Sequence, residues 1–527
     1  MVPFSKYPAI QKLKMLAQNP FDLTKNLTPD RLKDYCAKAC GYKFLYGTER
    51  VTSEVLEALT ELADEARAVE KMQGMQQGDI VNEIAGYPSE KRAALHTATR
   101  DFFNHPQTEP AAQEAAHLAR KENEKLQAFI SKIDTEGLYT DLVTVGIGGS
   151  DLGPRAHYFA LKHLLKPGRK IHYISNVDPD DAADVLRGIE DLNKTLVIVV
   201  SKSGTTLETA TNEALVREKF LKAGLEPKNH FLAITMPGTP MDNRQKYLEI
   251  FYMWDWIGGR YSTTSMCGAV MLAFAFGFAV YWDFLKGAHA MDQNALISDV
   301  KANLPLLAAL LGIWNRDFLK YPTVALIPYS QALIRYPAHI QQLDMESNGK
   351  RIDRQAASVD FLTGPIIWGE VGTNAQHSFF QLIHQGTDTI PVTLIAFKTS
   401  LYGEDLTVEG TTSQEKLLAN LFAQSLALAT GQASENPNEF FPGNRPTNVL
   451  LADQLNPFTL GALLSFFEHK VAFQGFIWGI NSFDQPGVQL GKLLANKIIR
   501  QFAEPNQNSH TSFPLGEAYL NHLKNIN

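Results

Sequence analysis

Short apolar runs that end in glycine or hydroxyl clusters recur along the chain from about residue 140. Four of them lie within LVTVGIGGS (142–150), KIHYISNVDP (170–179), TLVIVVSKSGTTLET (195–209) and HFLAITMPG (230–238). Strands that alternate with helical segments in this way are typical of a parallel sheet with helices on both faces. The pattern returns after residue 320 in TVALIPYS, GPIIWGEVGTN and TIPVTLIAF. The sequence therefore predicts an α/β protein with two such sheets.

The first part of the chain, to about residue 120, has a different pattern. Runs such as TSEVLEALTELADEARAVEKM (52–72) place apolar residues three and four positions apart, which predicts amphipathic helices. A chain of 527 residues exceeds one hydrophobic core, so we expect two domains, with a boundary near a helix at 283–300. The apolar segment 266–282 is shorter than the roughly 20 residues of a membrane span and predicts a buried helix.

Composition narrows the class of protein. The chain is 45% hydrophobic and 20% charged, which is ordinary for a folded soluble domain, and no secretory signal is visible at its start. A formal charge of −7 disfavours a nucleic-acid surface, which needs clustered Lys and Arg. The three cysteines, Cys36, Cys40 and Cys267, form neither a disulfide framework nor a paired metal motif. We expect a cytoplasmic protein with no nucleic-acid or membrane partner.

Two predicted strands end in loops suited to an anion. Gly146, Gly148 and Gly149 leave backbone amides unshielded ahead of Ser150 and a helix start. The second loop carries hydroxyls around a glycine, at Ser201, Ser203, Thr205 and Thr206. Each loop alone could be a helix cap in a glycine turn. Because the carboxyl ends of parallel strands share one edge of a sheet, the pair favours a phosphate monoester.

Nucleotides and metals are not favoured. GIGGSDLG does not complete G-x-G-x-x-G, because Asp151 takes the place of the last glycine, and neither loop ends as a P-loop does. The 14 histidines contain no H-x-H or H-E-x-x-H, and His377 and His384 are seven residues apart. We predict chemistry that does not depend on a metal.

Three charged residues stand where structure alone would not require them. Glu346, four residues after Gln342, falls in the last turn of a predicted helix that stops at 347–349; a carboxylate there opposes the helix dipole, which suits a proton acceptor. Lys492 falls in the early turns of a helix opened by Pro486 and Gly487, which suits a proton donor. Arg260, in GGRYS, could reach into a crevice. A surface Glu, a surface Lys and a structural ion pair are the alternatives.

Six segments together resemble the phosphoglucose isomerase family, in order and spacing over nearly the whole chain. They are GIGGSDLGP, SKSGTTLET, GGRYS, QQLDMESNGK, GTNAQHSFFQLIHQGT and FDQPGVQLGK. The resemblance implies two doubly wound parallel-sheet domains of sugar-isomerase type with an N-terminal helical extension. It divides the chain into an N-terminal region (1–119) packing on the second domain, a first domain (120–288), a second domain (289–510) and a tail (511–527).

The resemblance also implies an activity: a homodimer with shared active sites that interconverts glucose 6-phosphate and fructose 6-phosphate without a cofactor, in glycolysis and gluconeogenesis. Glu346 would move the proton between C1 and C2, Arg260 would stabilise the cis-enediolate, and His377 with Lys492 would open the ring. The substrate would be bound by Gly149, Ser150, Ser201, Lys202, Ser203, Thr205, Thr206, Gln342 and Gln485, with Gly149 and Lys202 acting through their backbone.

Two alternatives remain open. A regulator that binds sugar phosphates would use the hydroxyl loop but not Glu346, and it usually has a DNA-binding domain that the acidic first 120 residues do not resemble. An isomerase of another aldose phosphate, such as mannose 6-phosphate, would keep the chemistry and change the contacts with the sugar hydroxyls.

Overall fold

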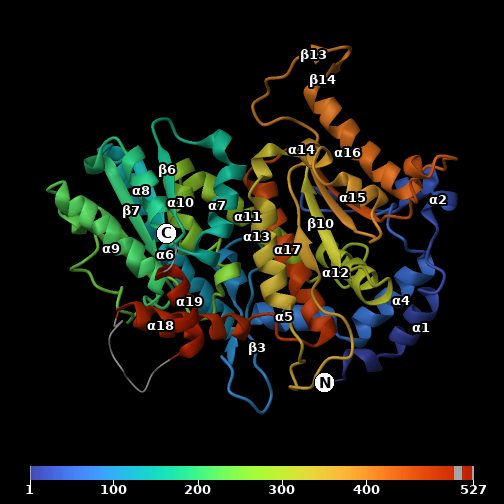
Figure 1. The fold of residues 1–527 in the computed structure, drawn as a ribbon, viewed down its shortest axis with the longest axis horizontal. Coiled ribbons are helices and arrows are strands. Elements are labelled where there is room, and N and C mark those ends of the chain that lie inside the picture. The colour runs from blue at the N-terminus through green and yellow to red at the C-terminus, as the bar shows by residue number, and fades with distance from the viewer. Residues whose placement is uncertain (1, 504–512, 525–527) are drawn as a thin grey trace. The chain divides into compact units, whose positions relative to one another are not determined.

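The first sheet of the computed structural model consists of five parallel strands in the spatial order β6-β5-β7-β8-β9 (Figure 1). Their bounds are β5 Asp141–Val145, β6 Lys170–Ile174, β7 Thr195–Val200, β8 Phe231–Thr235 and β9 Glu249–Tyr252. The structure describes residues 2–503 and 513–524. The central strand β7 is buried along its whole length, as expected for a parallel strand covered on both faces.

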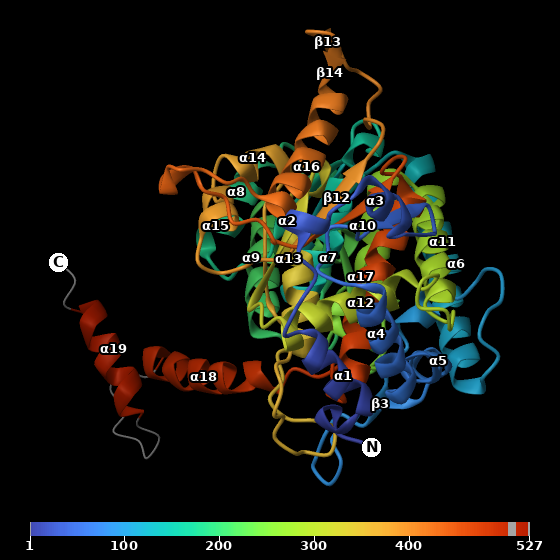
Figure 2. The same cartoon turned by 90° about the vertical axis from the view of Figure 1, so that its right-hand side faces the viewer.

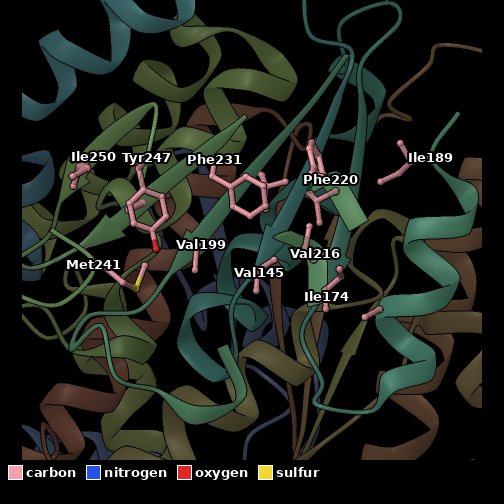
Figure 3. Close-up of a cluster of buried hydrophobic side chains, with 14 residues drawn as sticks. Val145, Ile174, Ile189, Val199, Val216, Phe220, Phe231, Met241, Tyr247 and Ile250 are labelled. Carbon is pink, nitrogen blue, oxygen red and sulfur yellow. The ribbon is translucent and has the colours of Figure 1, made fainter. Parts of the chain in front are cut away.

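The two faces of this sheet pack against different helices. On one face, α8 (Pro179–Gly188) and α9 (Leu207–Lys222) cover alternate strand residues such as Val145, Val199 and Phe231, and Val216 and Phe220 of α9 complete this cluster (Figure 3). α10 (Met266–Phe276), which contacts β5 and β6, is buried at every residue. The predicted buried helix is confirmed, but it ends at Gly277 (φ +94°), where α11 (Phe278–Asn294) begins. Helices on both faces make this half of the fold doubly wound.

The second sheet has six strands in the order β1-β2-β15-β12-β10-β11. Four are parallel, β10 Thr323–Pro328, β11 Ile366–Trp368, β12 Val392–Phe397 and β15 Thr447–Ala452. The other two, β1 Cys36–Ala39 and β2 Tyr42–Leu45, form an N-terminal hairpin that joins β15 antiparallel. The first 120 residues, expected to form helices and loops, therefore also contain strands, at 36–45 and in shorter pieces at 80–82 and 92–93.

Long apolar helices lie between the two sheets (Figure 1). α17 (Pro457–Trp478) contacts α11, α12 (Leu304–Ile313) and α5, and it is buried along nearly all of its length. The remaining helices are α1 Pro8–Leu16, α2 Leu23–Asn26, α3 Pro29–Asp34, α4 Ser53–Glu65, α5 Ala68–Gln77, α6 Pro110–Glu136, α7 Leu152–Ala160, α13 Tyr336–Gln341, α14 Gly372–Gln376, α15 Phe380–Gln385 and α16 Ser413–Thr430. Two short hairpins complete the strands, β3 Ile80–Asn82 with β4 Arg92–Ala93 and β13 Thr407–Val408 with β14 Thr411–Thr412.

The chain divides into two compact units, Met1–Ser482 and Phe483–Asn527, each with most of its contacts within itself. Both sheets belong to the first unit. The second contains α18 (Gln489–Ala503) and α19 (Pro514–Lys524), which pack on each other. The domain boundaries expected near 119 and 288 remain a proposal, and the boundary expected at 510 lies outside the described residues. Over the part of the chain that the structure describes, no helix is both long and apolar enough to span a membrane.

Candidate active site

The loop after β5 brings bare backbone to the carboxyl end of the first sheet. Gly148–Ser150 form a 3₁₀ turn, and α7 begins at Leu152. Gly148 has a φ of +61°, a conformation in which a side chain is strained. A Cβ on Gly149 would lie only 2.2 Å from the carbonyl carbon of Gly259. Glycine is therefore required here by the close approach of the loop that carries Arg260.

The hydroxyl loop after β7 gathers four side-chain hydroxyls at the start of a helix. Ser201 is buried, and its Oγ lies 3.0 Å from Oγ1 of Thr206. Oγ of Ser203 accepts hydrogen bonds from the amide and the hydroxyl of Thr205, at 3.2 and 2.9 Å. Thr206 precedes the first residue of α9, yet its side chain makes no capping hydrogen bond. The hydroxyl of Thr206, the N-cap residue, is thus not used to cap α9. Hydroxyls and the start of a helix meet in one loop, which suits an anion.

Lys202 lies in the middle of this loop, but its side chain turns away to a neighbouring turn. Its Nζ donates to the carbonyl oxygens of Asp255 and Ile257, each at 2.9 Å. Partial burial, and secondarily the charge of Arg92, lowers the pKa of Lys202 to about 8. This contact of the side chain has no signal in the sequence, where only a backbone role was expected.

A buried arginine and a partly exposed carboxylate face each other at the centre of the site. Nη1 of Arg260 lies 3.4 Å from Oε2 of Glu346, and the side chains are 2% and 23% exposed. The Nε of Arg260 donates to Oγ of Ser347 at 2.6 Å, and its Nη2 donates to the carbonyl of Ser482 at 2.6 Å. These bonds fix the plane of the guanidinium. Ser347 and Ser482 were not predicted as site residues, and only the position of Ser347 next to Glu346 could have indicated one of them.

Gln342 and Glu346 begin and end a π-helical turn that follows α13. Nε2 of Gln342 lies 3.5 Å from the position that a Cβ on Gly148 would take, so Gln342 faces the glycine loop. Asp344 in the same turn is fully buried and accepts a hydrogen bond from Nζ of Lys470 at 3.0 Å. The helical conformation ends at Asn348, which confirms the predicted stop; the π-helical turn itself was not predicted.

The predicted site residues fall into three groups. Arg260 contacts Glu346, and Gly149 packs against the loop that carries Arg260. Gln342 faces the neighbouring Gly148, and the hydroxyl loop is connected to the Arg260 loop through Lys202. His377 follows α14 and is exposed; in the described residues no hydrogen bond or ion pair joins it to Glu346. Gln485 and Lys492 belong to the second unit, where Lys492 is exposed in the first turn of α18, as the sequence predicts.

Across residues 2–503 and 513–524, no group of three or more His, Cys, Asp or Glu side chains is arranged to hold a metal ion.

Fold and site together define an α/β enzyme of the sugar-phosphate isomerase class. The model of the phosphoglucose isomerase family matches residues 45–514. The chain belongs to the phosphoglucose isomerase family.

Similar proteins cover the chain almost completely. A glucose-6-phosphate isomerase of Protochlamydia amoebophila is 69% identical over 521 residues, which are 99% of this chain and 97% of the relative. A glucose-6-phosphate isomerase of Chlamydia pneumoniae is 52% identical over 92% of each chain. The crystal structure of a glucose-6-phosphate isomerase from Chlamydia trachomatis has a TM-score of 0.95 at 48% identity and covers 99% of both chains. These comparisons confirm the family and the fold class expected from the sequence.

Proposed function

We propose residue roles for the reaction that family membership assigns to this chain, the interconversion of D-glucose 6-phosphate and D-fructose 6-phosphate. The observation that carries the proposal is the contact between Arg260 and Glu346 at the edge of a sheet that also presents the hydroxyl loop. A base beside a fixed cation is what proton transfer next to a carbonyl requires, because the developing oxyanion must be stabilised as the proton leaves.

The phosphate of the substrate would bind in the loop Ser201–Thr206 and beside Ser150. The four hydroxyls of this loop and the amides that open α9 can donate to its oxygens. Gly149 and Lys202 would contribute their backbone amides. The sugar would then extend toward Gln342, whose amide faces the glycine loop.

Glu346 would carry the proton between C2 and C1 of the open-chain sugar. Its carboxylate is partly exposed, so it can reach a substrate, while Arg260 is buried and held by Ser347 and Ser482. A guanidinium does not lose its proton, so Arg260 would stabilise the negative charge on the cis-enediolate oxygens throughout. The carboxylate and the guanidinium therefore divide the chemistry into proton transfer and charge stabilisation.

Ring opening would be carried out by His377 and Lys492, and Gln485 would contact the substrate. Opening removes a proton from the C1 hydroxyl and delivers one to the ring oxygen, which requires groups that can donate and accept protons. Both side chains are exposed, so neither is enclosed in the core of its own unit.

We further propose a homodimer in which His377 completes the active site of the other subunit. Its exposed position after α14 supports this role. The hairpin β13–β14 stands away from the rest of its unit (Figures 1 and 2), and Leu406 and Val408 there are 76% and 57% exposed. Apolar side chains on a projecting hairpin suit contact with a second copy. We keep the cytoplasm as the proposed location, because the three cysteines are free thiols and a reducing compartment preserves them.

A coupled assay tests the assigned reaction and its substrate. Purified protein is given glucose 6-phosphate, and formation of fructose 6-phosphate is followed with a fructose-6-phosphate-dependent enzyme. We expect turnover, and a kcat/KM for mannose 6-phosphate that is lower by at least about 100-fold, because a wrongly placed hydroxyl leaves polar groups of the site unpaired. A comparable kcat/KM for both epimers would contradict the substrate, and no turnover with either would contradict the reaction.

A further inference from the structure

In the turn at residues 254–257, which precedes Arg260, all four carbonyl groups accept hydrogen bonds. Two of these hydrogen bonds come from the side chain of Lys202. The carbonyl of Trp254 accepts from the amide of Ile257, and that of Trp256 from the amide of Leu95. The carbonyls of Asp255 and Ile257 accept from Nζ of Lys202. Buried carbonyl groups in proteins are almost always paired. Without Lys202, the carbonyl of Ile257, a residue with no exposed surface, would lose this partner.

This turn leads directly to the catalytic contact. The carbonyls of Gly258 and Gly259 accept from the amides of Tyr261 and Ser262 in the 3₁₀ turn Gly259–Tyr261. Gly259 also packs against Gly149 of the glycine loop. A displacement at Ile257 would therefore move the backbone from which Arg260 reaches Glu346.

The other end of the connection lies in the hydroxyl loop. Lys202 stands between Ser201 and Ser203, two of the hydroxyl residues proposed to bind phosphate. Its own carbonyl accepts from the amide of Met236 at 3.2 Å and from the hydroxyl of Thr235 at 3.4 Å, so its backbone is attached to the end of β8. The side chain of Lys202 thus connects the hydroxyl loop to the turn at residues 254–257.

Arg92 supports the same turn from a different element. Its Nη1 donates to the carbonyl of Asp255, which therefore has two cationic donors, while its Nη2 contacts Glu90. Ile257 receives a hydrogen bond from Lys202 but none is described from Arg92. Arg92 can partly replace Lys202 at Asp255, and Lys202 alone connects the turn to the hydroxyl loop among the described hydrogen bonds.

We propose that the side chain of Lys202 is a positioning residue that couples phosphate binding to the placement of Arg260. The inference rests on the proposed function. A phosphate that orders the loop Ser201–Thr206 also fixes the backbone of Lys202. The two hydrogen bonds from the Lys202 side chain then hold the turn at residues 254–257, and with it the backbone that leads to Arg260. Binding energy from the non-reacting phosphate is thereby used where charge develops in the transition state.

Two substitutions of this lysine test the coupling. In Lys202→Met the chain length is similar but both donors are lost, and we expect kcat to fall about 30- to 100-fold, the effect of a catalytic group displaced by roughly 1 Å. The inhibition constant of inorganic phosphate, which probes the hydroxyl loop alone, should change by less than about threefold. Binding of a phosphorylated five-carbon hydroxamate, whose planar group imitates the cis-enediolate, should weaken as much as kcat falls. Lys202→Arg keeps a cation and should recover part of kcat.

Control variants separate this effect from general damage. Arg92→Met removes one of two donors to Asp255 and should lower kcat less than Lys202→Met. Lys219→Met, on the exposed surface of α9, should leave kcat, KM and Tm unchanged. If Lys202→Met does not yield folded protein, Lys202→Gln and Lys202→Arg serve in its place, and a lower kcat with unchanged phosphate inhibition is again the expected result.

The outcomes distinguish the inference from the function beneath it. A wild-type protein without isomerase activity would contradict the proposed function. With an active wild-type protein, an unchanged kcat in the folded Lys202 variants would overturn the coupling. Lys202 variants that lose only affinity for phosphate would also overturn the coupling, because that result would mean that the ammonium group binds the phosphate itself.

Discussion

Nη1 of Arg260 and Oε2 of Glu346 are 3.4 Å apart, so a buried cation and a partly exposed carboxylate share one end of the candidate site. Arg260 lies in the turn after β9. Glu346 lies at the end of a helical segment that begins at Tyr336, 76 positions after Arg260 in the chain. A substrate whose C1 and C2 oxygens face Arg260 would present its C2 hydrogen to Glu346. The difference in exposure, 2% for Arg260 and 23% for Glu346, supports the two roles proposed above.

The role of Glu346 can be tested without disturbing its size. Glu346→Gln keeps the shape of the side chain and removes the proton acceptor, so turnover should fall by at least about 100-fold. Exchange of the C2 hydrogen of glucose 6-phosphate with solvent, followed by NMR in deuterated water, should stop with it. Glu226→Gln, on an exposed turn, should behave as the wild type does. Exchange at a near-normal rate in Glu346→Gln would show that another group is the base.

The charge of the hydroxyl loop can be changed at Ser201. Its Oγ lies beside Thr206 in the loop proposed to bind the phosphate dianion. Ser201→Asp adds a like charge within hydrogen-bonding range of that dianion, and KM should rise by at least about tenfold. Ser201→Asn has nearly the same size without the charge and should raise KM much less. Equal effects of both substitutions would mean that the site tolerates a negative charge and that the loop does not hold the phosphate.

The loops at the strand ends were predictable because their signals are local. A buried apolar run followed by glycines or hydroxyls marks the end of a parallel strand and the start of a helix, and both loops have this form in the structure. The hairpin β1–β2 was missed because its partner is distant: Leu45 pairs with Val449, and four-residue strands in a helical region give no periodic pattern. Strand β9 was missed for a similar reason, as a four-residue strand at a sheet edge.

Buried side-chain networks could not be predicted at all. Arg100 is fully buried and pairs with Asp292 at 2.8 Å and with Glu468 at 2.7 Å, and these residues lie on three different segments. Lys202 bonds to Ile257, and Arg260 to Ser482, across 55 and 222 residues. Such contacts depend on how the sheets and helices pack, and that information is not contained in any one stretch of sequence. The resemblance to a family proposed the reacting residues, but it gave no indication of the groups that hold them.

Two buried histidines make the free energy of unfolding sensitive to acid. His157 on α7 and His339 on α13 have rings 5.5 Å apart, and neither ring nitrogen of His339 has a hydrogen-bond partner in the described residues. Burial lowers the pKa of His157 to about 4; burial, then the charge of His157, lowers the pKa of His339 to about 3. The unfolded chain takes up a proton near pH 6.5 and the folded protein does not, so stability is lost as pH falls below 6.5.

His339→Gln should make this loss shallower, because glutamine is neutral at every pH. The variant is expected to be less stable than the wild type at neutral pH, where it loses ring packing. That difference should narrow by up to about 2 kcal/mol at about pH 5, from the 1.36 kcal/mol that each pKa unit represents. Urea unfolding of both proteins at neutral pH and at about pH 5 measures this difference in the free energy of unfolding. His117→Gln, on an exposed face of α6, should follow the wild-type profile, and a parallel profile in His339→Gln would contradict the assignment.

The proposed dimer with shared sites is tested by mixing two inactive variants. If His377 of one subunit completes the site that holds Glu346 of the other, Glu346→Gln and His377→Ala homodimers are both nearly inactive. Unfolding and refolding them together gives hybrids in which one site carries both substitutions and the other carries neither. With random pairing about half of the dimers are hybrids with one of two sites intact, so activity should return to roughly a quarter of the wild-type value. Each variant refolded alone is the control. If both residues served a site within one chain, every site in a hybrid would keep one substitution, and mixing would restore no activity.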